Sequence, residues 1–362
     1  MNSPNNNTAA ELRAKFGAAL CEGHSSGWLA AFADVPREHF IPVFLRQDEQ
    51  GAWNEVSAAD PGYLETVYSD TALTTRLDEN GVPTSSSSEP GLMLDALDAL
   101  DALDAQVGDT VYELGTGTGY NAALLASRLG SDSVVSVDVD PELVLLARER
   151  LAQHRLRPLT FAGDGAEGYP ARAPYDRVIA TAGLRCIPPP LLSQVREGGV
   201  IVAPVGFGVA RVVVPDGGEA AGQFLPTPAF FMPRRTAGRS PDFAGLEVRP
   251  VERASVPVQD VLDRLRFPLS LALPGYHSCS WRDDEGNLTG VGLWVDDGST
   301  ATAHVGGKVR QIGPRRLWDT VEELASIFSK GTPAREDFGL AITPDSQRAW
   351  YRVPDGPSWT LL

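Results

Sequence analysis

Three glycines at alternate positions, Gly115, Gly117 and Gly119, suggest a ligand-binding turn. They lie in the stretch 111–121, which has the pattern of a buried strand, a tight turn and a helix that starts near Tyr120. Glycine tolerates positive φ and leaves the main chain bare, and the first N–H groups of a helix are free to bind a polar or anionic group. The stretch therefore predicts a site for a nucleotide-like ligand.

Acidic residues follow at positions that suit such a ligand. Asp138 ends an apolar run about 20 residues beyond the glycines, where a carboxylate can accept hydrogen bonds from the two hydroxyls of a ribose. Asp164, between two glycines, can accept one from the amino group of an adenine. The series resembles the S-adenosylmethionine site of class I methyltransferases more than a nicotinamide site; a dinucleotide enzyme and a degenerate Rossmann domain are the alternatives. The predicted cofactor-binding residues are Glu113, Gly115, Thr116, Gly117, Gly119, Tyr120, Asp138, Val139, Asp164 and Gly165.

Strand and helix patterns alternate in the segment around this turn. Helices are expected at 122–129, 141–154 and 189–195, and strands at 134–137, 159–161, 176–180 and 200–203. Such alternation is typical of a mostly parallel sheet with helices on both faces, which binds ligands at the carboxyl ends of its strands. We therefore expect an α/β protein with the class I, Rossmann-like methyltransferase fold.

The chain is expected to have three parts. Residues 1–80 would form an N-terminal helical segment on the substrate side, residues 81–235 the methyltransferase domain, and residues 236–362 a smaller β-rich accessory domain, separated by a linker at 237–241. In residues 94–105 a leucine recurs every three positions, which predicts a helix that begins against the core and turns toward solvent. The last part holds tryptophans that either fill its core or form a peptide-binding surface: Trp281, Trp294, Trp318, Trp350 and Trp359.

Charge and composition exclude several classes of function. The net charge of the 362 residues is −16, which disfavours binding to the phosphates of nucleic acids. The sequence has no apolar run long enough to span a membrane and starts with a polar stretch, so we expect a cytoplasmic protein without a membrane partner. Cys21, Cys186 and Cys279 are far apart and lack metal-ligand spacing with the histidines, so we expect free thiols and no bound metal.

Outside the glycine turn, further segments resemble the protein-L-isoaspartyl O-methyltransferases. Residues 35–42 read Val-Pro-Arg-Glu-His-Phe-Ile-Pro, close to a Val-Pro-Arg-x-x-Phe-Val-Pro segment of that family, and Ser88-Glu89-Pro90 stands where the family has Ser-Gln-Pro. Other matches follow in order, over about residues 35–206, at 68–75, 113–120, 138–141, 163–165, 173–179, 187–189 and 198–199. Glu89 departs from the family pattern and places a carboxylate beside the expected position of the substrate carboxylate.

The expected chemistry is the transfer of a methyl group from a sulfonium to a carboxylate. The nucleophile is already ionised near neutral pH, so no strong base is required. Ser88 and Ser87 are the candidate catalytic residues, whose hydroxyls would orient the substrate carboxylate; a flexible serine-rich loop is the alternative. The methyl ester would then activate the carbonyl carbon toward the next backbone nitrogen and lead to a succinimide and to isoaspartate.

A closer resemblance concerns the substrate. The segments 84–90, 115–125, 174–181 and 231–235 look like those of methyltransferases encoded beside ATP-grasp ligases that macrocyclise ribosomal peptides into graspetides. This resemblance implies methylation of one aspartate in a cyclised precursor peptide, followed by aspartimide formation. Residues 236–362 favour it, on the expectation that repair requires only the catalytic domain. The alternatives are repair of L-isoaspartate in damaged proteins and a non-catalytic peptide-binding protein with the same fold.

Overall fold

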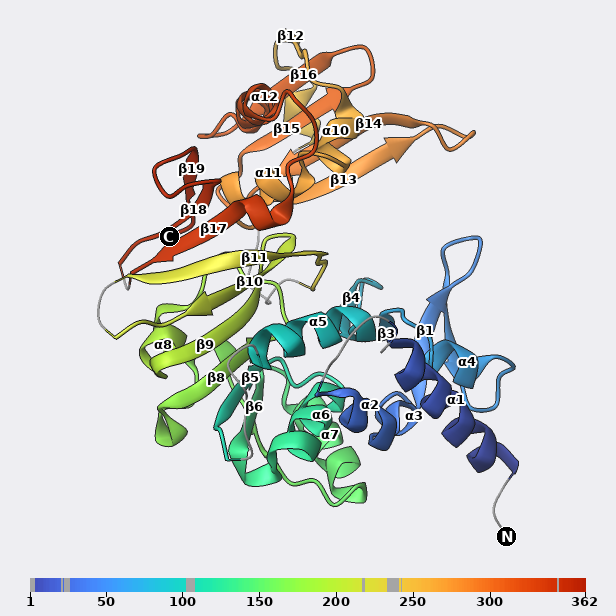
Figure 1. The fold of residues 1–362 in the computed structure, drawn as a ribbon. Helices are drawn as coiled ribbons and strands as arrows, with labels where there is room; N and C mark the ends of the chain where they lie inside the picture. The colour runs from blue at the N-terminus through green and yellow to red at the C-terminus, as the bar shows by residue number, and fades with distance from the viewer. Residues whose placement is uncertain are drawn as a thin grey trace. The chain divides into compact units, whose positions relative to one another are not determined.

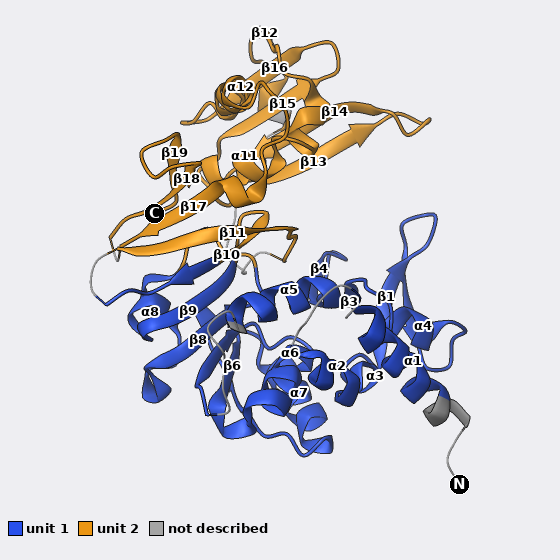
Figure 2. Cartoon of the chain, viewed as in Figure 1, with its two compact units in different colours: residues 1–182, 188–203, 211–218 blue, residues 183–187, 204–210, 219–362 orange. Residues whose placement is uncertain are grey.

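The computed structural model describes residues 4–20, 22, 27–101, 108–216, 219–232, 241, 243–343 and 345–362 (Figure 1). By its internal contacts the chain divides into two compact units, coloured separately in Figure 2. Unit 1 comprises residues 1–182, 188–203 and 211–218, and unit 2 comprises residues 183–187, 204–210 and 219–362. The division departs from the expected boundaries, because residues on both sides of position 80 share unit 1 and unit 2 begins before position 236. Residues 237–240 of the expected linker lie outside the described part.

Unit 1 contains the expected parallel sheet, with strand order β9-β8-β5-β6-β7. Its strands are β5 Val111–Leu114, β6 Val134–Asp138, β7 Leu159–Ala162, β8 Tyr175–Ala180 and β9 Val195–Val205. The central strand β5 is buried along its whole length, as expected for a parallel strand covered on both faces. The connecting helices are α6 Tyr120–Leu129, α7 Pro141–Gln153 and α8 Pro189–Ser193, with 3₁₀ turns η1 Ser131–Ser133, η2 Gly165–Glu167 and η3 Pro170–Arg172. The predicted class I methyltransferase fold is confirmed.

The chain before β5 adds a second, antiparallel sheet to unit 1, with strand order β2-β1-β3-β4. This part contains α1 Pro4–Leu20, α2 Leu29–Asp34, α3 Arg37–Phe40, β1 Val43–Gln47, β2 Trp53–Ser57, α4 Tyr63–Val67, β3 Leu73–Leu77, β4 Pro83–Ser87 and α5 Pro90–Asp101. Its helices agree with the expected helical segment, but the description of residues 1–80 as helical misses the sheet. Buried and exposed residues do not alternate clearly in β1, where only Phe44 is buried. The period of two that identifies a strand in a sequence is therefore weak there.

The leucine repeat forms α5, whose described part stays against the core instead of turning to solvent. Leu94, Leu97 and Leu100 are all buried, and this helix contacts both α1 and β8. One such contact is made by Trp28, whose Nε1 donates to the carbonyl of Leu97 at 3.1 Å. The rest of the repeat, from residue 102 to residue 105, lies outside the described residues.

Unit 2 is mostly antiparallel β-structure. One set of strands pairs in the order β11 Ala220–Pro228, β17 Phe338–Ile342, β18 Gln347–Tyr351 and β19 Ser358–Thr360, and β10 Gly208–Val213 has residues in both units. A five-stranded sheet has the order β12 Glu252–Arg253, β16 Lys308–Ile312, β15 Thr300–His304, β14 Leu288–Trp294 and β13 His277–Arg282. The helical segments are α9 Phe243–Leu246, α10 Val258–Leu262, α11 Arg266–Ala272, α12 Leu317–Ile327 and η4 Arg335–Asp337.

The tryptophans of unit 2 pack in aromatic clusters. Trp318 is buried, with 2% of its surface exposed. Trp281 and Trp294 are half-buried and lie edge-on to Phe243, with ring centroids 5.5 and 5.9 Å from it. Core filling therefore accounts for much of this aromatic content, and a peptide-binding role for unit 2 stays a prediction.

Within the described residues, none of the helices is both long and apolar enough to cross a membrane. The same residues contain no cluster of three or more His, Cys, Asp or Glu side chains that could hold a metal ion. Cys186 and Cys279 are free thiols, and Cys21 lies outside the described part of the chain.

Candidate active site

The turn after β5 has the positive φ angles that its glycines permit: 100° at Gly115, 50° at Gly117 and 88° at Gly119. A Cβ on Gly115 would lie 2.4 Å from Oγ1 of Thr181, and one on Gly119 would lie 2.9 Å from Cβ of Ala147. Both positions must therefore be glycine to let β8 and α7 pack close to the turn. Thr181 ends the segment 174–181 and was not among the predicted site residues, yet its hydroxyl donates to the Gly115 carbonyl at 2.6 Å.

Gly117 differs from its neighbours, because a Cβ there would meet nothing closer than 3.7 Å. The nearest atoms are the Ser86 carbonyl oxygen and the Ser85 hydroxyl, both on β4. The Gly117 N–H donates to the Asp138 carboxylate at 2.8 Å, and that carboxylate also accepts from the N–H of Asp140 at 3.0 Å. The structure thus brings the bare backbone, the acidic end of β6 and the serine strand together.

Glu113 is wholly buried beneath the turn, with no exposed surface. Its carboxylate accepts from Asn121 Nδ2 at 2.7 Å and from the hydroxyl of Ser136, which also contacts the Thr116 hydroxyl at 2.6 Å. Burial raises the pKa of Glu113 to about 7, although the two hydrogen bonds act in the opposite direction. Glu113 and the Thr116 side chain therefore make internal contacts that tie β5, β6 and α6 together.

The other predicted cofactor residues fall into two groups. Val139 is 54% exposed, and Asp164 is exposed, with Oδ1 accepting from Ala166 N–H at 2.9 Å, so both are accessible at the edge where β6 and β7 end. Gly165 is buried, and a Cβ there would lie 2.7 Å from Cγ of Leu114. The Tyr120 ring is also buried, packing against Phe32 and Phe40, so a side-chain contact of Tyr120 with the cofactor has no support in the described geometry.

The candidate catalytic serines lie at the end of β4. Ser87 is buried, with 4% exposed surface, and Ser88 is half-buried. Both contact Arg37, whose Nη2 lies 3.4 Å from the Ser87 hydroxyl and 3.1 Å from the Ser88 carbonyl. Ser87 therefore belongs to a paired strand, and Ser88 follows its end. Arg37 was not among the predicted site residues, although it belongs to the Val-Pro-Arg segment noted in the sequence.

Glu89 follows the serines and is exposed. Partial burial together with the nearby Asp70 and Asp95 carboxylates raises the pKa of Glu89 above its ordinary value. Asp70 itself accepts from the Gly91 N–H at 2.6 Å, which holds it beside the start of α5. The substrate side of the serines is therefore acidic.

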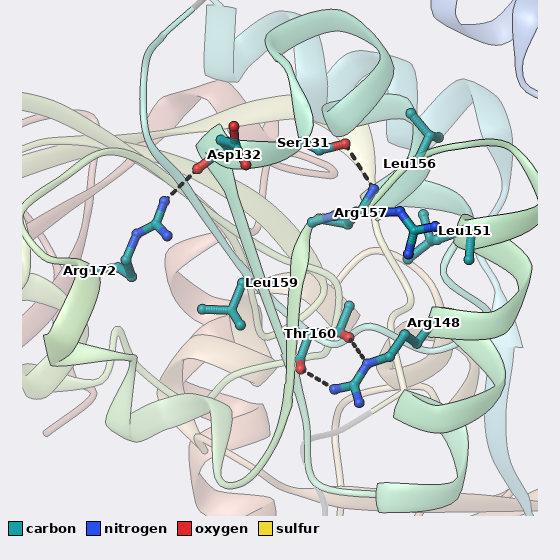
Figure 3. A pocket seen from close by; sticks show the side chains of 11 residues that line it. Ser131, Asp132, Arg148, Leu151, Leu156, Arg157, Leu159, Thr160 and Arg172 are labelled. Carbon is teal, nitrogen blue, oxygen red and sulfur yellow. Dashed lines mark hydrogen bonds between the residues drawn. The ribbon is translucent and has the colours of Figure 1, made fainter.

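A separate pocket of about 300 Å³ lies in unit 1, at the C-terminal end of α7 and the N-terminal end of β7 (Figure 3). Two of its arginines bond to neighbouring chain atoms: Arg148 donates to the hydroxyl and carbonyl of Thr160 at 3.1 and 2.7 Å, and Arg172 donates to the Asp132 carbonyl. Since α7 starts beside Asp138 and β7 ends beside Asp164, this pocket is distinct from the predicted cofactor site.

Comparisons with known proteins agree with this geometry. The family model for protein-L-isoaspartate(D-aspartate) O-methyltransferase matches residues 23–216. The chain belongs to this family. The protein-L-isoaspartate O-methyltransferase of Ignicoccus hospitalis is 35% identical over 177 residues, which are 48% of this chain and 71% of that protein. Protein-L-isoaspartate O-methyltransferase 1 of Polaromonas sp. is 34% identical over 181 residues, 49% of this chain and 63% of that protein.

A solved structure of a protein-L-isoaspartate O-methyltransferase has a TM-score of 0.55 to this chain and is 21% identical in sequence. It covers 94% of this chain and 100% of its own, so its fold has counterparts for most of unit 2 as well as unit 1. An accessory C-terminal region is therefore compatible with the family. The expectation that this region sets the chain apart from repair enzymes stays a prediction.

The methyl donor of this methyltransferase family is S-adenosylmethionine. The described residues fit it: Gly117 offers open backbone, Asp138 offers a carboxylate beside that backbone, and Val139 and Asp164 are accessible at the same edge. Glu113, Thr116 and Gly165 support the site from below, since their side chains or Cβ positions face the protein interior.

Replacing Asp138 by Asn should weaken S-adenosylmethionine binding at least about tenfold, because a hydrogen bond to a charged acceptor contributes about 1.5–3 kcal/mol. Isothermal titration calorimetry with S-adenosylmethionine measures the change. Asp132→Asn, which removes the same charge at an exposed site by the separate pocket, is the matched control and should leave the affinity unchanged. Equal affinities of wild type and Asp138→Asn would contradict the assignment.

Glu113→Gln should remove a pH dependence of stability. The folded-state pKa of Glu113 is about 7 against an ordinary 4.5, so the folded chain binds more protons between these values and wild-type stability falls as pH rises through them. Relative to Glu113→Gln, the wild type should lose about 3 kcal/mol of unfolding free energy between about pH 5 and about pH 8. Urea denaturation at both pH values tests this, with the exposed Glu149→Gln as control; parallel curves would refute it.

Proposed function

We propose that this protein methylates a carboxylate of a peptide or protein substrate, with S-adenosylmethionine as the donor. The observation that carries the proposal is the convergence at Gly117, where open backbone lies between the Asp138 carboxylate and β4. Ser87 ends that strand and Ser88 follows it, which supports adjacent donor and acceptor sites within unit 1. Family membership agrees with this reaction class.

When bound, S-adenosylmethionine supplies a methyl group on a positively charged sulfur. The glycine turn and Asp138 would hold this donor, and methylation of the substrate carboxylate would give a neutral ester and a neutral sulfur. The chain contributes by holding both reactants in line and by excluding water, and positioning alone can lower the barrier by about 7–11 kcal/mol. Ser87 and Ser88 are the candidate hydroxyls that orient the carboxylate; the reaction requires no general base.

L-isoaspartate in a protein chain is the substrate that the comparisons support best. The family model and the two curated relatives carry that substrate in their names, and the family match spans the serine strand as well as the cofactor turn. In this reading the methyl ester activates the carbonyl, the following backbone nitrogen attacks it, and methanol leaves as a succinimide closes.

An L-aspartate within a cyclised ribosomal peptide, made by an ATP-grasp ligase, is the second candidate. The specific observation in its favour is Glu89, which replaces the glutamine of the family pattern and lies in an acidic environment next to Ser88. A negative residue there disfavours a flexible chain that presents a free carboxylate. It is compatible with a substrate whose ring structure fixes the carboxylate in place.

Mass spectrometry of the two substrate types separates these candidates. Wild-type protein with S-adenosylmethionine should add the mass of one methylene group to an isoaspartyl peptide, and later products should lack one water relative to the starting peptide. The matched aspartyl peptide is the control. Transfer to a cyclised aspartyl peptide and none to the isoaspartyl peptide would establish the second candidate instead, and no transfer to either would contradict the proposed function.

Glu89→Gln should increase kcat/KM for an isoaspartyl peptide about fivefold, because removing a like charge near the acceptor relieves about 1 kcal/mol of repulsion. The gain should shrink as pH falls, since Glu89 with its raised pKa is then protonated in the wild type. Initial rates across a pH series measure both effects. Glu149→Gln removes the same charge elsewhere and should change neither, and an unchanged or lower kcat/KM in Glu89→Gln would exclude repulsion by Glu89.

A further inference from the structure

Arg37 is an arginine with no exposed surface inside unit 1. It begins α3, and its Nη1 donates to the carbonyls of Val67 and Ser69 at 2.8 and 3.0 Å, while Nη2 donates to the carbonyl of Thr71 at 3.0 Å. The guanidinium thus holds together the backbone of segment 67–71, which connects α4 to β3. Neutral carbonyl groups make all three contacts.

The same guanidinium reaches the candidate catalytic serines. Nη2 lies 3.4 Å from the hydroxyl oxygen of Ser87 and donates to the carbonyl of Ser88 at 3.1 Å. Because the Ser87 hydroxyl accepts a hydrogen bond from Arg37, its own hydrogen is directed to another acceptor. A substrate carboxylate beside β4 is an acceptor of the required type.

Arg37 also faces the cofactor turn. Its guanidinium carbon lies 5.9 Å from the ring centroid of Tyr120, the first residue of α6 after Gly119. Tyr120 is buried, and among the described residues its hydroxyl has no hydrogen-bond partner. Three parts of the site therefore meet at one buried cation: the segment 67–71, the serine strand and the start of α6.

Stability alone is a poor reason for this arrangement. A buried charge is costly, and Arg37 has a further cost because its Nε lacks a partner among the described residues. Burial lowers the pKa of Arg37 to about 10, so the side chain stays charged at neutral pH. Even buried ion pairs can often be replaced by apolar side chains without loss of stability, so burial of a charge is weak evidence of a stabilising role.

Charge cancellation explains why such a cation would lie behind the serines and not in contact with the substrate. The acceptor carboxylate loses its charge as the methyl group is transferred, so a cation in direct contact would stabilise the bound substrate more than the transition state. A cation that does not contact the substrate can instead fix the position of a neutral hydroxyl. That hydroxyl remains a good hydrogen-bond donor throughout the reaction.

We propose that Arg37 is a positioning residue, which fixes the Ser87–Ser88 segment and orients the Ser87 hydroxyl to donate to the substrate carboxylate. The proposal rests on the carboxylate methylation proposed above. It assigns to Arg37 no contact with the substrate or the cofactor. Its effect passes through Ser87 and through the backbone of Ser88.

The first test does not depend on activity. Hydrogen exchange in full-length Arg37→Lys should become faster in segments 67–71 and 85–91, because lysine keeps the charge but cannot make five hydrogen bonds in this planar arrangement. Exchange in the cofactor turn, 115–119, should stay unchanged. Unchanged exchange in both Arg37-bound segments would overturn the positioning role even if the proposed function is correct.

The second test uses the peptide that wild-type protein methylates. Arg37→Lys should retain S-adenosylmethionine affinity within about twofold and lose about tenfold or more in kcat/KM, and Ser87→Ala should show the same pattern. In the double variant the two losses should not add, because both remove one orienting interaction. Additive losses, wild-type kinetics of Ser87→Ala, or a parallel loss of cofactor affinity in Arg37→Lys would each overturn the proposal.

Arg128→Lys is the matched control. Arg128 lies over the Trp28 ring at 4.4 Å in the same unit and stabilises packing without a described contact to Ser87 or Ser88. It should lower the thermal unfolding midpoint while its effect on kcat/KM adds normally to that of Ser87→Ala. If wild-type protein methylates neither peptide type, the proposed function fails, and the hydrogen-exchange result still decides whether Arg37 fixes the serine segment.

Discussion

Close backbone packing at the end of β5 determines the geometry of the site. There is no room for a Cβ at Gly115 or Gly119. A Cβ at Gly115 would lie 2.4 Å from Oγ1 of Thr181, and one at Gly119 would lie 2.9 Å from Cβ of Ala147. These two contacts lock β8 and α7 onto the turn and leave Gly117 as the position with space around it. The Asp138 carboxylate can then bond to the Gly117 N–H, which places the end of β6 beside the open backbone.

A buried carboxylate completes the support beneath that turn. Glu113 receives hydrogen bonds from α6 and β6, yet burial still raises its pKa to about 7. The protein thus accepts an electrostatic penalty to keep three elements in register below the cofactor site. The same logic applies to Arg37 on the substrate side, where a buried cation connects segments that are distant in sequence.

Local spacing was sufficient to predict the parallel sheet, the turn and the position of Asp138 at the end of a strand, because strand, turn and helix signals lie within about 30 residues of one another. It was insufficient to predict that the side chains of Glu113 and Tyr120 are buried, because their burial depends on which elements cover them. It also missed Arg37, since nothing in the sequence shows that position 37 will meet residues 67–71 and 87–88. β9 starts at Val195, where the end of a helix was expected, because that boundary has little periodic signal.

An acidic protein that binds a carboxylate must limit repulsion at its own active site. The net charge is −16, and the Asp70 and Asp95 carboxylates lie near Glu89, which follows the serines. The described cation behind the serines, Arg37, is fully buried and therefore offers no general attraction to acidic chains in solution. Long-range electrostatics then disfavours acidic peptides, and short-range geometry must select the substrate. Under the proposed function, a carboxylate already held in a fixed conformation would lose the least entropy on binding, and substrate shape would then matter more than charge.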